Sequence, residues 1–138
     1  MYLLDTNVIS EIRKGSRANS GVTTFFRQVS QNDTQVYLSA ITVGELNRGL
    51  QLVRYRGDLD QATMLENWLK KVIAEFEANI LQFGTEEAFV WGQLRVPRYE
   101  NAIDKQIAAT AFVYDLTLVT RNTRDFDGTG VKLLNPFS

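Results

Sequence analysis

Apolar and polar residues follow two alternating periods along this chain. Five short apolar runs, each bounded by polar or turn-forming residues, are typical of buried strands. They cover residues 2–4, 36–40, 80–83, 117–120 and 131–134. Between these runs apolar residues recur at spacings of three and four, which predicts helices. The helices are expected at residues 7–14, 22–30, 41–53, 58–79, 85–96 and 103–114.

This order of strands and helices predicts an α/β fold, in which helices cover both faces of a parallel sheet. The chain has 138 residues, which is long enough to bury a core of its own. No internal repeat, low-complexity segment or break in composition divides it. We therefore expect one domain over residues 1–138.

The opening segment MYLLDTN is the part around which the rest of the chain is organised. Asp5 comes directly after the first apolar run, and open α/β sheets bind their ligands at the carboxyl ends of the strands. A carboxylate is costly to bury without a partner, so Asp5 should face a cleft, a metal ion or a donor. The alternative interpretation is that Asp5 or Thr6 only caps the helix that follows.

Two further acids are notable for their position, because they also lie beside strand ends or helix starts. Glu45 lies in the first predicted turn after the second strand, at the same sheet edge as Asp5. Asp104 opens the helix before the fourth strand and reaches that edge only through an intervening crossover. Glu45 also has a structural interpretation, because Thr42 and Glu45 match the capping-box pattern. Thr85 is likewise expected to cap its helix.

Composition narrows the chemistry, because the chain contains no Cys and no His. Disulfides, thiol nucleophiles, imidazole-bound zinc and Ser-His-Asp triads are thereby excluded. Carboxylates and other oxygen donors remain, and these are the ligands that Mg²⁺ or Mn²⁺ prefers. The net charge of −1 means that binding to nucleic acid would need a local basic rim.

Neither a signal-peptide pattern nor a membrane-spanning apolar stretch is found in the sequence. Asp5 interrupts the first apolar run almost at once, and no other run approaches the roughly 20 residues that span a bilayer. We expect a cytoplasmic protein with no membrane contact.

Four segments, in this order, resemble the motifs of PIN-domain nucleases. They are MYLLDTNVIS, YLSAITVGEL, IDKQIAATA and LTLVTRNTRDF. The similarity extends over essentially the whole chain. It is closest to the toxin ribonucleases of VapBC-type toxin–antitoxin pairs, including FitB-like proteins. The resemblance implies a PIN-like three-layer sandwich, with a five-stranded parallel sheet flanked by helices and carboxylates clustered around Mg²⁺ or Mn²⁺.

The same resemblance assigns roles to individual residues. The catalytic and metal-binding acids of the family fall on Asp5, Glu45 and Asp104. The place of a fourth acid, present in many members, holds Asn122, and Asp125 follows one turn later as a partial replacement. From their positions beside these motifs, and not from the resemblance, auxiliary or structural roles near the metal are expected for Thr6, Thr120, Asn122 and Asp125. Arg121 and Arg124 are expected to contact RNA because their loop follows the fourth strand at the predicted active edge, and the alternative for each is a solvated surface cation. Other cations near the motifs are Arg13, Lys14, Arg48 and Lys105.

The function implied is that of a toxin that hydrolyses RNA through a metal-activated water, leaving 5′-phosphate products. Its expected partners are the RNA substrate, a cognate antitoxin, DNA contacted through that antitoxin, and a second copy in a homodimer. The antitoxin is expected in a groove between the helix from Ile41 and the helix from Asp58, lined by Leu50, Leu52, Val53, Arg54 and Tyr55.

Two alternative functions belong to other functional classes. The first is a PIN-fold binding module with weak catalysis, acting through an antitoxin and DNA complex, which the missing fourth acid favours. The second is an aspartyl-phosphate phosphatase or receiver, which also has an acid after the first strand. Phosphatases of that type need a second acid two residues later, where this chain has Asn7.

Overall fold

The computed structural model describes all residues from Met1 to Ser138, and its centre is a sheet of five parallel strands. The strand order is β3-β2-β1-β4-β5, so the predicted five-stranded parallel sheet is confirmed. The strands are β1 (Tyr2–Leu4), β2 (Val36–Ser39), β3 (Ile80–Leu81), β4 (Thr117–Val119) and β5 (Leu133–Leu134). The α-helices are α1 (Thr6–Ile12), α2 (Ser20–Gln31), α3 (Ala40–Tyr55), α4 (Leu59–Glu75), α5 (Thr85–Leu94) and α6 (Ala102–Val113). Three 3₁₀ turns complete the chain: η1 (Gly15–Arg17), η2 (Glu77–Asn79) and η3 (Thr123–Phe126).

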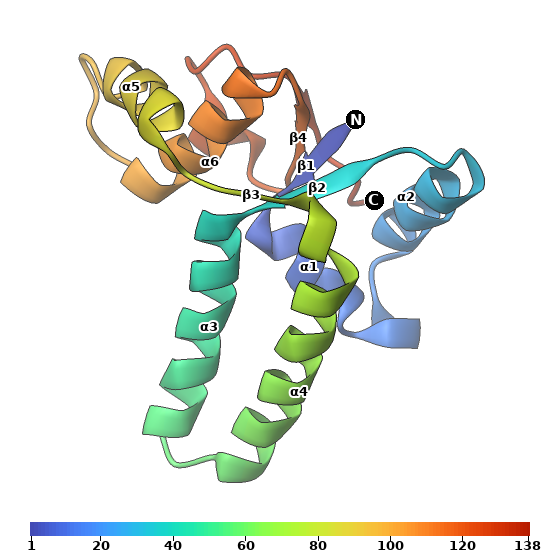
Figure 1. The fold of residues 1–138 in the computed structure, drawn as a ribbon. Coiled ribbons are helices and arrows are strands. Elements are labelled where there is room, and N and C mark those ends of the chain that lie inside the picture. The colour runs from blue at the N-terminus through green and yellow to red at the C-terminus, as the bar shows by residue number, and fades with distance from the viewer.

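Helices cover the sheet on both faces, which gives three layers (Figure 1). The alternation of side chains along β1 explains the layers. Leu4 is buried in an apolar cluster with residues of α1, α2, α3 and α4. Its neighbour Leu3 points to the opposite face and packs in a second cluster that α6 dominates. Figure 1 also shows α3 and α4 as a helical hairpin that extends away from the sheet.

Several predicted boundaries were too long or misplaced. The runs at 80–83 and 131–134 each contribute only two residues to the sheet, because edge strands pair on one side alone. The predicted helix over 58–79 ends at Glu75, and η2 follows it. The prediction that Thr85 caps α5 is wrong. Gly84 is the N-cap, and the carboxylate of Glu87 accepts a hydrogen bond from the Gly84 N–H (3.2 Å).

The strand register decides which residues meet at the carboxyl edge of the sheet. Leu4 of β1 pairs with Val119 of β4, so the next residues, Asp5 and Thr120, are neighbours. The chain leaves β1 toward β2 on one side and returns through β4 on the other. Such a reversal of strand order opens a crevice at the carboxyl ends, where α/β proteins bind ligands. None of the helices is long and apolar enough to cross a lipid bilayer.

Candidate active site

Asp5 is the most tightly held acid at this edge, and only 4% of its surface is exposed. One oxygen, Oδ1, accepts a hydrogen bond from the Thr6 N–H (2.8 Å), so Asp5 is the N-cap of α1. The other oxygen, Oδ2, accepts a hydrogen bond from the Thr120 hydroxyl (2.7 Å). The capping interpretation is therefore correct. Capping uses only Oδ1, so Oδ2, which is turned toward the end of β4, can still have a chemical role.

Asn7 links Asp5 to the loop that follows β4. Its Nδ2 donates to Asp5 Oδ2 (3.3 Å) and to Thr120 Oγ1 (3.4 Å), and its Oδ1 accepts from the Arg121 N–H (3.1 Å). The Asn122 N–H donates to Thr120 Oγ1 (3.1 Å). We did not predict this role of Asn7 from the sequence. The signal was present, because Asn7 is the third polar residue in succession after the first strand.

Burial and like charges govern the protonation of these acids. Burial raises the pKa of Asp5, against the hydrogen bonds from Thr120, Thr6 and Asn7, and the charge of Asp125 raises it further. The pKa of Asp104 is raised to about 6, first by burial and then by the charges of Asp5, Asp125 and Glu45. Charges act on a pKa in this way only at short range. Asp5, Asp125 and Glu45 therefore lie within electrostatic range of Asp104.

Glu45 reaches this space from the second turn of α3. The predicted capping box of Thr42 and Glu45 is wrong, because α3 begins earlier and Ser39 caps it by accepting from the Ile41 N–H (3.0 Å). Thr42 instead lies inside the helix, and its buried hydroxyl has no hydrogen-bond partner. Glu45 is half-buried and takes part in no side-chain hydrogen bond or ion pair, so helix capping does not account for it.

The donor set at this edge fits a hard divalent cation. It consists of carboxylates that repel one another, and a cation relieves such repulsion. As the side chains stand, no three acids are close enough to hold one ion among them. Asp5 is fixed by its hydrogen bonds, whereas the side chains of Glu45, Asp104 and Asp125 carry none. These three are therefore the groups that can adjust to an ion.

The predicted RNA-contacting residues lie in the loop after β4. Arg121 and Arg124 are both exposed, and neither is in an ion pair. The buried Lys105 donates its ammonium hydrogen bond to the Arg98 carbonyl, and Lys14 pairs with Glu11 (2.9 Å). These two lysines are thus engaged within the protein, in contrast to the two arginines.

A groove of about 350 Å³ adjoins the acidic edge between α1, α3 and α4. Thr6 and Glu45 line its end nearest the acids, and Arg13 and Trp68 line its wall. The five residues predicted to line one groove for an antitoxin are divided between two hollows, and the binding of an antitoxin there stays a prediction. Leu50 and Val53 line this groove, whereas another hollow of about 450 Å³ is lined by Arg48, Gln51, Leu52, Arg54 and Tyr55. Residues on different faces of α3 therefore line two separate hollows.

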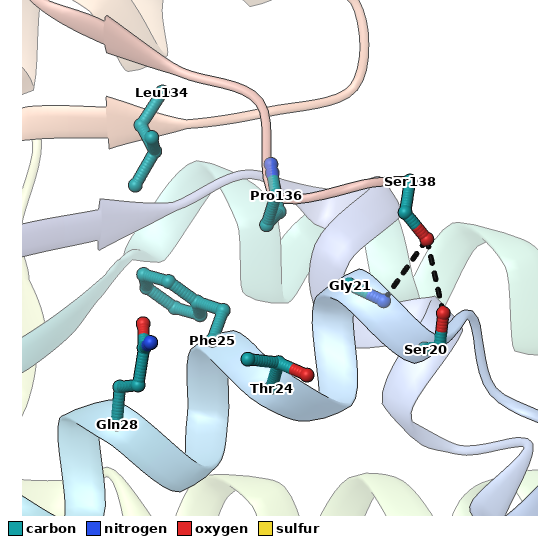
Figure 2. A pocket seen from close by; sticks show the side chains of 8 residues that line it. All are labelled: Ser20, Gly21, Thr24, Phe25, Gln28, Leu134, Pro136 and Ser138. Carbon is teal, nitrogen blue, oxygen red and sulfur yellow. Dashed lines mark hydrogen bonds between the residues drawn. The ribbon is translucent and has the colours of Figure 1, made fainter.

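A third hollow, of about 400 Å³, lies beside α2 and contains no acidic side chain (Figure 2). It is lined by Ser20, Gly21, Thr24, Phe25, Gln28, Leu134, Pro136 and Ser138. None of the four acids Asp5, Glu45, Asp104 and Asp125 lines it, so it does not belong to the candidate active site.

Comparisons with known proteins agree on one family. The family model of the PIN domain matches residues 2–132. The chain is 34% identical to toxin FitB of Neisseria gonorrhoeae, over 99% of both chains. It is 29% identical to VapC ribonuclease Y4jK of Sinorhizobium fredii, over 99% of this chain and 98% of the relative.

Solved structures give the same result. The crystal structure of FitAcB from Neisseria gonorrhoeae superposes with a TM-score of 0.85 at 35% identity, covering 99% of this chain and 98% of that one. The structure of FitAB bound to a DNA fragment superposes with a TM-score of 0.83 at 33% identity, covering 100% of this chain and 96% of that one.

Proposed function

Since this chain belongs to the PIN-domain family, among toxins of the FitB and VapC kind, we propose that it is a metal-dependent endoribonuclease and the toxin of a type II toxin–antitoxin pair. The observation that carries the proposal is that Asp5 lies beside the residues after β4 at the carboxyl edge, with Thr6 and Glu45 lining the groove that adjoins it. Asp104 lies within electrostatic range of these acids, because its pKa is raised first by burial and then by the charges of Asp5, Asp125 and Glu45. The relatives named VapC ribonuclease support RNA as the substrate.

In this proposal Asp5, Glu45 and Asp104 hold Mg²⁺ or Mn²⁺, and Asp125 supplies the fourth charge that Asn122 cannot. The bound cation would act as a Lewis acid and lower the pKa of a water molecule. Because water is the nucleophile, the RNA 2′-hydroxyl is not needed, and 5′-phosphate products are expected.

The remaining residues at this edge have supporting roles. Thr120 and Asn7 fix the orientation of Asp5 through their hydrogen bonds, and Thr6 contributes its backbone N–H. Such outer partners set ligand geometry. Arg121 and Arg124 offer unpaired positive charge to RNA phosphates at an edge that is otherwise acidic.

The purified protein should cleave single-stranded RNA in the presence of Mn²⁺ or Mg²⁺ and stop when EDTA is added. Glu45→Gln should lower the cleavage rate at least about a hundredfold, because loss of several kcal/mol of charge stabilisation corresponds to such a factor. Its thermal unfolding should stay at the wild-type temperature, since Ser39 caps α3 without Glu45. Glu75→Gln, at an exposed position at the end of α4, is the matched control. Undiminished cleavage in EDTA would contradict metal dependence.

A catalytically weak binding module, acting through an antitoxin and DNA complex, is the second candidate. Asn122 in place of a fourth acid favours it, as does the lack of three acids within reach of one ion. The cleavage assay separates the two functions, because a binding module would leave RNA intact with either metal.

The proposed partner is a cognate antitoxin, through which the toxin contacts DNA, and the proposed setting is the cytoplasm. The FitAB relative bound to a DNA fragment supports such an assembly. We propose that the antitoxin occupies the groove between α1, α3 and α4, since this groove ends at Thr6 and Glu45. We also propose that the toxin forms a homodimer. Light scattering of the purified toxin tests this, because it gives the molar mass in solution.

Gly49 gives a direct test of this groove. It lies on α3, lines the groove, and a Cβ there meets no atom within 4 Å. Gly49→Leu should fill the groove and weaken the toxin–antitoxin complex at least about tenfold, while helix propensity rises. Gly92→Leu, on α5 with equally open space, is the control. The complex is formed by co-expression with the small protein encoded beside the toxin, and calorimetry gives its affinity. If Leu52→Asp weakens the complex and Gly49→Leu does not, the antitoxin occupies the other hollow.

A further inference from the structure

Phe137, far from the acids in sequence, lies under a cation of the candidate active site. The Arg121 guanidinium carbon is 5.0 Å from the centre of the Phe137 ring. We propose that Phe137 is a positioning residue, which holds Arg121 where its charge meets an RNA phosphate. This inference rests on the proposed function, because it concerns how the same edge binds its substrate.

Arg121 is held at two points, and it lies within electrostatic range of Glu11, whose pKa is lowered mainly by the hydrogen bonds from Lys14 and Asn19 and also by the charge of Arg121. Its backbone N–H donates to Asn7 Oδ1 (3.1 Å), and Asn7 in turn donates to Asp5 Oδ2. Its guanidinium lies over the face of Phe137, an arrangement that attracts a cation and leaves its N–H donors available. The side chain is exposed and in no ion pair. Arg121 is therefore oriented without a direct ion pair, so that its guanidinium donors stay available to a phosphate.

Phe137 is itself fixed by the segment around it. Ser138 donates its backbone N–H to Asn19 Oδ1 (3.0 Å) and accepts at Oγ from the Gly21 N–H (3.2 Å). Figure 2 shows Ser138 bonded to Ser20 and Gly21 at the start of α2. Pro136 lies so close that a Cβ on Gly21 would be 2.2 Å from its carbonyl oxygen. The half-buried Phe137 ring also packs against the core on the α1–α4 face.

These contacts join α2, the 135–138 segment, Arg121 and Asn7 into one chain that ends at Asp5. Arg124, three residues later in the same loop, has no aromatic partner. The structure therefore distinguishes Arg121 as the arginine whose position is prepared in advance.

The salt dependence of RNA binding tests the inference, because each phosphate neutralised on a single strand contributes about 0.7 to the slope of log affinity against log salt. The probe is a short fluorescent oligouridine, measured by anisotropy in EDTA so that no metal-dependent cleavage occurs. Arg121→Gln should lower the magnitude of the slope by about 0.7. Phe137→Leu should also reduce the magnitude of the slope. The slope of the double variant should be no smaller in magnitude than that of Arg121→Gln alone. Phe137→Trp, which keeps an aromatic face, should restore the wild-type slope.

Two further variants keep the test decisive. Phe112→Leu replaces a partly exposed phenylalanine on α6 and should behave as wild type. Gly21→Ala leaves the side chains of Phe137 and Arg121 chemically unchanged, but its Cβ forces the Pro136 carbonyl and the Ser138 N–H, on either side of Phe137, to move. It should therefore reduce the slope as Phe137→Leu does, and it provides a second test if Phe137→Leu folds poorly.

The outcomes separate this inference from the function on which it rests. If the wild type binds and Arg121→Gln lowers the slope, but Phe137→Leu and Gly21→Ala keep the wild-type slope, then Phe137 only packs the core and the inference is overturned. Effects of Arg121→Gln and Phe137→Leu that add in the double variant would overturn it as well. If the wild-type protein cleaves no RNA with Mn²⁺ or Mg²⁺, the proposed function itself fails first. If it cleaves RNA but binds none in EDTA, Arg121 makes no phosphate contact of its own and the inference is overturned.

Discussion

Asp5→Asn is expected to abolish RNA cleavage, with a loss of at least about a thousandfold, while the protein folds as stably as the wild type. The proposed cation supplies several kcal/mol of charge stabilisation, and each 1.36 kcal/mol is a factor of ten in rate. Asp5 is the acid whose orientation the protein fixes most completely, through Thr6 and Thr120. An amide at this position removes the negative charge and one of the two oxygen donors.

Stability should survive this change because asparagine preserves most of what Asp5 does for the fold. Asparagine is as good an N-cap as aspartate, so the bond from the Thr6 N–H can remain. The Thr120 hydroxyl already accepts from Asn7 and from the Asn122 N–H, so it must give up the longer bond from Asn7 (3.4 Å) to accept from the new amide group, at a cost of about 1 kcal/mol. Burial disfavours the charged form of Asp5, as its raised pKa indicates. The free energy of unfolding should therefore stay the same or increase.

The measurement pairs two assays on one preparation. In Asp5→Asn, RNA cleavage and Mn²⁺ binding measured by calorimetry should both be lost. The thermal midpoint of unfolding should not fall. Asp33→Asn is the matched control, because Asp33 is exposed at the turn before β2 and its positive φ of 51° suits asparagine. A variant that cleaves RNA at the wild-type rate would remove Asp5 from the proposed site.

The apolar pattern of the strands predicted most of this architecture, because it indicates which faces of the sheet are buried and which residues meet at its carboxyl edge. Leu3 and Leu4 are consecutive apolar residues bounded by polar ones, which is typical of a short strand buried on both faces, and both are fully buried. Parallel pairing then places Asp5 next to the residue after β4, whatever the loops do. The sheet and its acidic edge thus follow from short-range patterns.

Other features depend on tertiary contacts that spacing does not encode. Thr42 matches a cap pattern as well as Ser39 does, and only the start of α3 decides between them. Lys105 resembles a surface cation, yet the loop before α6 folds back and offers it the Arg98 carbonyl. The contact of Phe137 with Arg121 spans two loops, and no local pattern announces it. Asp125 reaches the acids only because η3 turns it toward them, as the raised pKa values of Asp5 and Asp104 indicate.

Metal binding is expected to tighten as pH rises, because Asp104 must lose a proton before it can serve as a ligand. Its pKa of about 6 lies well above the ordinary value of 3.8, as a result of burial and of the charges of Asp5, Asp125 and Glu45. Below about pH 6 the affinity for Mn²⁺ should therefore fall by up to about tenfold for each pH unit, since one proton competes with the cation. Above this pH the affinity should level off.

The same shift predicts an opposite trend for the stability of the metal-free protein. The folded state holds the Asp104 proton more tightly than the unfolded state, so between the two pKa values the folded state binds more protons. Stability from this group is present at low pH and is lost as pH rises toward about 6. A bound cation offsets the repulsion, so Mn²⁺ should raise the thermal midpoint more at about pH 7 than at about pH 5.

Asp104→Asn separates this group from all others that titrate in the same range. The variant should bind Mn²⁺ weakly, and the part of the pH dependence that centres near 6 should vanish both from binding and from metal-free stability. Calorimetry and thermal unfolding across this pH range, with and without Mn²⁺, measure both effects. Asp115→Asn is the control, because Asp115 is exposed and pairs with Lys132 after α6. Should Asp104→Asn keep the wild-type pH dependence, the group that titrates near 6 would not be Asp104, and its burial among Asp5, Asp125 and Glu45 would not control metal binding.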